Sequence, residues 1–106
     1  MFTRIVELTT KPDKNKQLSE TIHDKVLPIL KRQKGFLDET VLVSDKEDNR
    51  VLSLSFWKTR EDAEEYHRAE YQKVKEIVQH LLEAEPMIRT FDVHSSTTHR
   101  ISAKAA

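Results

Sequence analysis

Residues 51–62 read VLSLSFWKTRED and contain two structural signals in succession. From Val51 to Lys58, the side chains alternate with the period of two that predicts a β-strand. One face of this strand is clearly apolar and carries Leu52, Leu54 and Phe56; the other carries Val51, Ser53, Ser55 and Trp57. The next residues, Thr59-Arg60-Glu61-Asp62, form a variant of the capping box, so a long helix is expected from Arg60 to about Ala84. The segment therefore predicts a strand that passes directly into a helix.

Toward the N-terminus, the sequence predicts a strand, a helix and a second strand. Phe2–Thr9 is rich in the β-branched residues that are typical of strands. Apolar residues then recur with the helical period, at Leu18, Ile22, Val26, Ile29 and Leu30. Pro28 lies inside this pattern and is expected to kink the last turn. Gly35 is expected to end the helix in a left-handed conformation, and a strand should follow from Phe36 to Ser44.

Toward the C-terminus, Pro86 is expected to stop the long helix, and Met87–His94 alternates as a fourth strand. The order β-α-β-β-α-β predicts an α+β, ferredoxin-like fold, in which two helices cover one face of a four-stranded antiparallel sheet. No core-forming period follows Ser95. We therefore expect one domain over residues 1–95 and a flexible tail, or an arm on a partner, over residues 96–106.

The second face of such a sheet has no element of this chain to cover it. It would carry Val, Leu and aromatic side chains from several strands, and an uncovered apolar face of that extent is unusual for a monomer. We therefore expect a homodimer through the sheet face, with the sheets packed face to face or with exchanged C-terminal strands.

The composition excludes several classes of function. The chain has 106 residues, with 18 Lys+Arg against 18 Asp+Glu and no cysteine. Zero net charge disfavours nucleic-acid binding, and the absence of cysteine excludes thiolate metal sites and a cysteine nucleophile. No spacing of His or carboxylate residues indicates a metal site, and no apolar run approaches the ~20 residues of a membrane span. We expect a soluble, cytoplasmic protein without a metal, a nucleic-acid partner or a membrane.

The expected long helix has an inward stripe whose character changes along its length. At about 100° per residue, one arc carries Ala63, Tyr66, His67, Glu70, Tyr71, Val74, Ile77, Val78 and Leu81. The C-terminal half of this arc is aliphatic, whereas the N-terminal half is polar or amphipathic. Because burying an unpaired ionisable group is costly, these polar residues either lie at the edge of the core or line a cleft between helix and sheet. Both interpretations stay open.

In the cleft interpretation, Trp57, Tyr66 and Tyr71 are the candidate walls of a pocket for a small aromatic ligand. His67 is the candidate catalytic proton acceptor, because imidazole titrates near neutral pH. Glu70 lies three residues further along the helix and is the candidate that orients or charge-stabilises His67.

Several segments between Leu27 and Val93 carry a family resemblance: Leu27-Pro28, Lys34-Gly35-Phe36, Val41–Asp45, Ser55–Asp62, Leu81-Leu82 with Pro86, and Thr90–Val93. Together they resemble the antibiotic biosynthesis monooxygenase (ABM) domain family, which is part of the dimeric α/β-barrel superfamily. The segment around Trp57 is similar to the family's W-x-S-x-E junction between strand and helix, and Trp57 is the residue that carries over. Ser53 and Ala63 stand where some members have Asn and Tyr.

The resemblance implies a ferredoxin-like protomer, a dimeric α/β barrel and a cleft between the sheet and the helices. Some members of the family oxidise hydroquinones to quinones with O2 and without a metal or flavin. A deprotonated, electron-rich phenolate can itself reduce O2, so such a site needs a base and a dry aromatic pocket. Other members degrade haem with an Asn, an aromatic residue and a His. Here Glu7, Tyr66 and Glu76 fall near those places, and the loss of the His argues against haem degradation.

The sequence thus leads to two functional hypotheses. The first is a cofactor-independent monooxygenase that oxidises a small phenolic or quinol-type aromatic substrate with O2. The alternative is a non-catalytic dimeric module of the same fold that binds a small molecule or serves as a scaffold.

Overall fold

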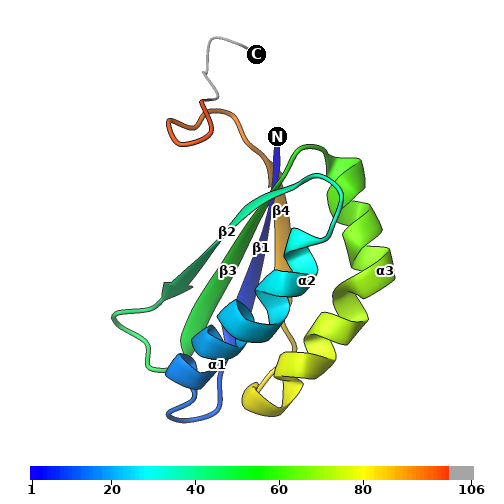
Figure 1. The fold of residues 1–106 in the computed structure, drawn as a ribbon. Helices are drawn as coiled ribbons and strands as arrows, with labels where there is room; N and C mark the ends of the chain where they lie inside the picture. Colours follow the sequence, from blue (N-terminus) through cyan, green and yellow to red (C-terminus); the bar gives the residue numbers. More distant parts are fainter. Residues whose placement is uncertain (101–106) are drawn as a thin grey trace.

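The computed structural model describes residues 1–100 and has the element order that the sequence predicts (Figure 1). The elements are β1 (Phe2–Thr9), α1 (Asn15–Thr21), the π-helical segment η1 (Ile22–Val26), α2 (Leu27–Lys31), β2 (Phe36–Val43), β3 (Arg50–Trp57), α3 (Arg60–Val78), the 3-10 turn η2 (Gln79–Leu81) and β4 (Met87–Asp92). The four strands form an antiparallel sheet in the order β2-β3-β1-β4. The predicted α+β, ferredoxin-like fold is confirmed.

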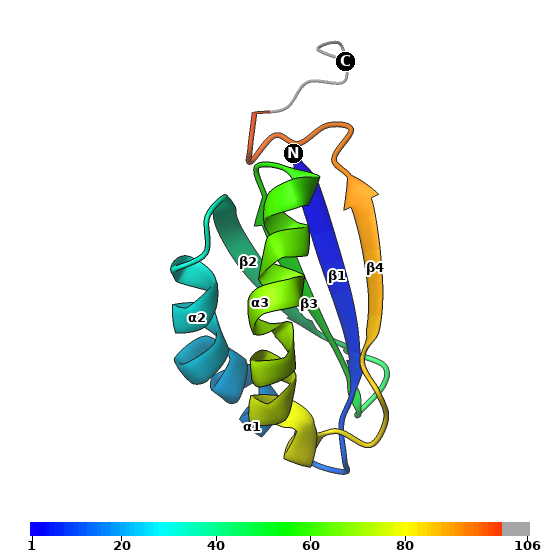
Figure 2. The same cartoon turned by 90° about the vertical axis from the view of Figure 1, so that its right-hand side faces the viewer.

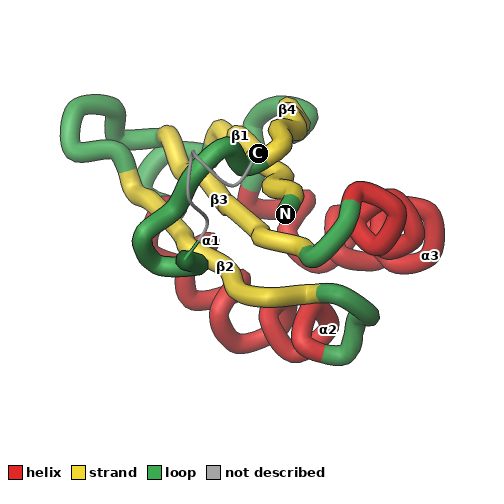
Figure 3. Tube along the Cα trace, turned by 90° about the horizontal axis from the view of Figure 1, so that it is seen from above, coloured by secondary structure: helices red, strands yellow, loops and turns green. Residues whose placement is uncertain are grey.

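The helices lie on one side of the sheet (Figures 2 and 3). The first helical region packs against β2 and β3, and α3 packs against β1 and β3. Because side chains alternate across a strand, Phe2, Arg4, Val6 and Leu8 of β1 face the helices. The core between the two layers includes Leu18, Ile22, Leu30, Val51, Trp57, Tyr66, Val78 and Leu81.

The first helical region runs from Asn15 to Lys31 but changes its pitch in the middle. The π-helical segment Ile22–Val26 directly precedes Pro28, which lies in the first turn of α2. A proline ring clashes with the carbonyl group four residues earlier, at Asp24, and this wider turn accommodates the ring. The sequence did not predict this π-turn, which lies directly before Pro28. The helix ends at Lys31, and Gly35 has the expected positive φ of 79° but lies beyond a short turn.

The helix α3 begins as predicted but ends earlier than Ala84. The Thr59 hydroxyl accepts a hydrogen bond from the backbone N–H of Asp62 at 3.1 Å, which caps the first turn. At the other end, Lys11 N–H donates to the Leu81 carbonyl and Glu83 N–H donates to the Thr9 carbonyl. These bonds attach the chain to the end of β1, so the helix cannot continue past the η2 turn.

The remaining differences are at the C-terminal end. β4 ends at Asp92 rather than His94. His99 packs against Phe56 with ring centres 4.8 Å apart, and its Nε2 lies 2.7 Å from Asp38 Oδ2. The prediction of a flexible tail over residues 96–106 extends beyond the described residues, which end at Arg100. None of the helices within residues 1–100 is long and apolar enough to cross a membrane.

Candidate functional site

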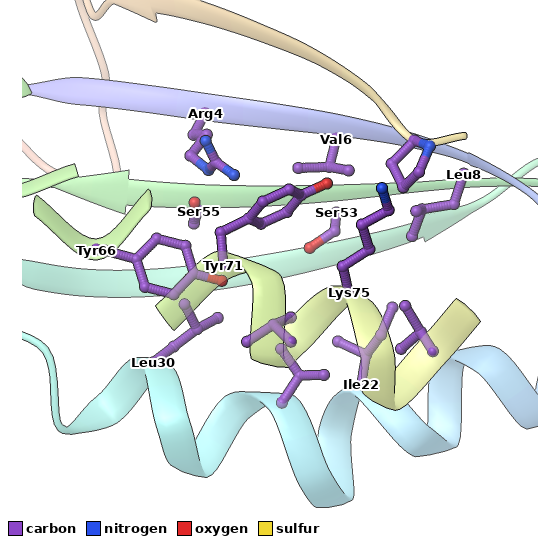
Figure 4. A pocket seen from close by; sticks show the side chains of 14 residues that line it. Arg4, Val6, Leu8, Ile22, Leu30, Ser53, Ser55, Tyr66, Tyr71 and Lys75 are labelled. Carbon is purple, nitrogen blue, oxygen red and sulfur yellow. The ribbon is translucent and has the colours of Figure 1, made fainter. Parts of the chain in front are cut away.

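A small cavity of ≈ 50 Å³ lies between the sheet and the helices (Figure 4). Its walls are mostly aliphatic, but one end is polar and aromatic, with Arg4 and Ser55 from the sheet and Tyr66 and Tyr71 from α3. The other lining residues are Val6, Leu8, Ile22, Val26, Leu30, Ser53, Val74, Lys75, Val78 and Pro86. Of the polar half of the predicted helix stripe, Tyr66 and Tyr71 therefore line the cavity, whereas His67 and Glu70 do not.

Arg4 is the central residue of the polar end. It is 5% exposed, and its Nη1 donates a hydrogen bond to His67 Nδ1 at 3.1 Å. Its guanidinium carbon lies 4.8 Å from the ring centre of Tyr71 and 5.5 Å from that of Tyr66, within the range of cation–π attraction. Its other terminal nitrogen, Nη2, is buried and has no hydrogen-bond partner among residues 1–100. Burial lowers the pKa of Arg4, although a guanidinium keeps its charge near neutral pH.

Trp57 is fully buried and supports the cavity from behind rather than lining it. Its indole Nε1 donates to Ser55 Oγ at 2.9 Å, and its ring stacks on that of Tyr66 with the ring centres 5.2 Å apart. Burial raises the pKa of Tyr66, so its hydroxyl stays protonated. Trp57 thus fixes the orientation of one cavity wall.

His67 is exposed and lies on the outer side of this cluster. Its ring stacks on that of Tyr71 with the centres 4.8 Å apart. Because arginine can only donate, Nδ1 accepts the bond from Arg4, and the neutral ring carries its proton on Nε2. Partial burial, together with the positive charge of Arg4, lowers the pKa of His67. The imidazole is therefore held neutral, with one nitrogen occupied by Arg4.

Glu70 does not hold His67 in this structure. It is half-buried, and no hydrogen bond or ion pair joins it to another side chain within residues 1–100. The hydrogen-bond partner of His67 is Arg4 instead. The structure therefore brings Tyr66, His67 and Tyr71 together around an arginine, with Trp57 behind them.

A second, open groove of ≈ 500 Å³ adjoins the cluster on the side of His67. Its lining residues are Phe2, Arg4, Arg60, Ala63, Glu64, His67, Arg68 and Thr90. Three arginines and one glutamate give this groove a net positive charge. Arg4 lines both the groove and the cavity, so it forms part of the boundary between them.

The sequence did not single out two ionisable residues of the interior, the buried Arg4 and the half-buried Glu39. Arg4 lies on the same face of its strand as Phe2, Val6 and Leu8. A single arginine among apolar residues on one face would have indicated a functional residue. Glu39 lies in a half-buried position on β2, and its Oε2 accepts a hydrogen bond from Ser53 Oγ at 3.0 Å. Burial raises the pKa of Glu39. No cluster of His, Asp and Glu side chains among the described residues is arranged to hold a metal ion.

Residues 1–76 match the family model described as antibiotic biosynthesis monooxygenase. No curated protein matches the sequence. Solved structures of similar fold include a monooxygenase from the gene ActVA-Orf6 of Streptomyces coelicolor, in complex with nanaomycin D. It has 18% identity and a TM-score of 0.77, and the match covers 90% of this chain and 88% of that one.

Two further structures are similar. The first is SnoaB, a cofactor-independent oxygenase from Streptomyces nogalater, with 13% identity and a TM-score of 0.76; the match covers 91% of this chain and 95% of that one. The second is a Nitrosomonas europaea protein assigned to the same family, with 21% identity and a TM-score of 0.72. That match covers 88% of this chain and 98% of the other. At these identities the structural matches establish the fold.

Proposed function

The chain belongs to the antibiotic biosynthesis monooxygenase family, and from this membership we propose that it is a cofactor-independent monooxygenase. Its substrate would be a small phenolic or quinol-type aromatic compound, and its oxidant O2. The observation that carries the proposal is the polar and aromatic end of the cavity under α3, where Tyr66, Tyr71 and Arg4 meet in an otherwise aliphatic interior.

The chemistry needs a deprotonated substrate in a site with little water. A phenolate transfers one electron to O2, and the resulting radical pair combines at the carbon para to the oxygen to give a hydroperoxide. Loss of water from the hydroperoxide leaves a quinone. One oxygen atom of O2 enters the product and the other leaves as water, so the reaction balances with phenol and O2 as the reactants.

The candidate residues have distinct roles in this proposal. Tyr66, with Trp57 stacked behind it, and Tyr71 provide aromatic walls for the substrate ring. His67 accepts the phenolic proton at Nδ1, which becomes available when Nη1 of Arg4 turns to the substrate oxygen. The low pKa of His67 keeps it unprotonated at neutral pH, as a base requires. Glu70 makes no contact with His67 in this structure, so it would stabilise the imidazolium only after its side chain turns toward the ring.

The test is oxygen consumption with a panel of phenols and hydroquinones, using protein that has been treated with a chelator. We expect uptake of O2. With ¹⁸O2, phenols whose para carbon carries hydrogen should give a quinone with one labelled oxygen, whereas a para-hydroquinone already holds both oxygens and should give unlabelled quinone and hydrogen peroxide. His67→Ala should reduce kcat by about 100-fold or more, the usual contribution of a general base. His80→Ala, which changes an exposed histidine beyond the end of α3, is the matched control. Full activity in His67→Ala would show that the base is another group.

The second candidate function is a non-catalytic module that binds a small molecule. The size of the cavity favours it, because ≈ 50 Å³ is well below the roughly 150 Å³ of an apolar cavity that binds benzene. An aromatic ring would enter only if side chains of α3 move. Ligands that raise the melting temperature without any oxygen consumption would favour this function.

We further propose that the protein is a homodimer through the open face of its sheet. Apart from His99 over Phe56, this face has no covering element in the described part of the chain, and Leu42, Met87 and Phe91 are about half exposed on it. Burial of these side chains by a second copy would remove apolar surface from water.

A further inference from the structure

Arg4 is a buried positive charge without a negative partner. Buried charges in proteins are normally paired, because the loss of hydration is expensive. Within residues 1–100 Arg4 forms no salt bridge, and its Nη2 makes no hydrogen bond. By contrast, Lys75, the other cation that lines the cavity, is bonded to Glu85. The unmatched charge of the cavity is therefore that of Arg4.

The neighbours of Arg4 leave this charge uncompensated. His67 is neutral while its Nδ1 accepts the bond from Arg4. Tyr66 and Tyr71 are neutral as well, because burial raises the pKa of both hydroxyls. Their ring faces attract the guanidinium but provide no hydrogen-bond acceptor for Nη2. One positive charge remains, and it matches a monoanion better than a dianion, which would leave a second charge unpaired in the interior.

The surroundings favour a flat ligand whose charge is at one end. Two tyrosine rings flank the guanidinium, and Figure 4 shows Arg4 reaching from β1 toward Tyr71 and Ser55. The adjoining groove carries Arg60 and Arg68, which are exposed and paired with Asp92 and Glu65. Their charges are therefore largely compensated, whereas the Nη2 of Arg4 is buried and has no hydrogen-bond partner among the described residues.

We propose that Arg4 is the anchor for the carboxylate of a small aromatic acid, which Nη2 holds while the ring packs against Tyr66 and Tyr71 after side chains of α3 move to widen the cavity. If the protein is the proposed oxygenase, on which this part of the inference rests, its phenolic substrate carries a carboxylate that Arg4 binds. The binding of an aromatic acid at Arg4 does not itself require any turnover. Arginine suits this role because its planar group donates several N–H bonds in the plane of a carboxylate.

The experiment is equilibrium binding by calorimetry at neutral pH, with benzoate and benzamide as the probes. The two have nearly the same shape and differ in charge. We expect benzoate to bind at least about 10-fold more tightly than benzamide, the usual difference for a hydrogen bond to a charged group. Acetate should bind more weakly than benzoate, because it lacks the ring. Equal affinity for benzoate and benzamide, or for benzoate and acetate, would overturn the proposal without any variant being needed.

The variants locate the effect at Arg4. Arg4→Gln should weaken benzoate binding roughly 10- to 100-fold and leave benzamide within about threefold, whereas Arg4→Lys, which keeps the charge, should lose less. Arg32→Gln, at the exposed end of α2, is the matched control and should bind benzoate like the parent protein. Unchanged benzoate affinity in a folded Arg4→Gln variant would contradict the proposal. Absence of oxygen consumption would contradict the proposed oxygenase and leave this result standing.

Discussion

Glu39 places a carboxyl group in a half-buried position on the helix-facing side of the sheet, close enough to Tyr66 to affect its pKa. Its own pKa is raised by burial, although the bond from Ser53 opposes the shift. An acid with a higher pKa in the folded protein contributes stability that is present below its unfolded-state pKa. That stability is lost as the pH rises through the folded-state pKa.

We therefore predict that Glu39→Gln raises the melting temperature at neutral pH, because the variant has the same shape and no charge. The difference from the parent protein should shrink toward about pH 4, where the parent carboxyl is also protonated. Thermal unfolding followed by circular dichroism at several pH values measures this effect. Glu20→Gln, on the exposed side of α1, should show no such pH dependence. A variant that is less stable than the parent at pH 7 would contradict the prediction.

The positions of the candidate residues were predictable to different degrees. Tyr66 and Tyr71 followed from the helical period alone, because that period fixes which residues of α3 point inward. The partner of His67 did not follow, because Glu70 is near in sequence whereas Arg4 is 63 residues away and becomes a neighbour only when β1 meets α3. The spacing of residues along one helix does not predict a contact between that helix and a strand.

Gly35 connects the first helical region to β2 at the place where α3 begins. Its φ is +79°, which residues with a Cβ rarely adopt, and an added Cβ would overlap with Asp62, 2.5 Å from Cγ and 2.7 Å from Cβ. The Gly35 carbonyl also accepts a bond from Lys58 N–H at 2.8 Å, so the turn cannot easily move away. This junction therefore requires glycine for both conformation and space.

We predict that Gly35→Ala lowers the free energy of unfolding by about 2 kcal/mol or more, from the left-handed backbone and the overlap together. Urea denaturation measures this decrease in the free energy of unfolding. Asp13 is the matched control, because it also has a positive φ, of 61°, and Asp13→Gly should leave stability unchanged or slightly higher. If both substitutions lower the stability equally, backbone conformation does not explain the requirement for glycine.

The periodicity of the sequence predicted helices and strands best within long regular segments and least well at the ends of these segments. All four strands lie where alternation predicted them, within about two residues. The end of α3 was misplaced by several residues because backbone bonds from β1 capture the chain after Leu81. The π-turn before Pro28 was also missed, since the proline is visible in the sequence but the way the helix adapts to it is not.

The whole molecule exposes apolar side chains on the face of the sheet that the helices leave open. Register places Leu42 opposite Leu52 and Phe91 opposite Thr3, on the side away from Arg4 and the core. Phe56 on this face is covered by His99, whereas Leu42 is 46% exposed and Phe91 is 51% exposed. Sequence alone predicted such a face from the number of elements, but the register was needed to identify the residues at its two edges.

If the open face is the interface of a homodimer, charge at its edges should separate the subunits. We predict that sedimentation of the parent protein gives a mass of about twice 12.4 kDa, and that Leu42→Asp and Phe91→Asp shift it to a single chain, because a buried unpaired carboxylate opposes association.

Val43→Asp is the matched control. Val43 is 51% exposed on the same edge strand, but it pairs with Val51 and so lies on the opposite side of the sheet. A parent protein of 12.4 kDa at micromolar concentration would contradict the dimer. Dissociation by Val43→Asp as readily as by Leu42→Asp would instead place the interface at the β2 edge, because only an edge contact would involve both sides of that strand.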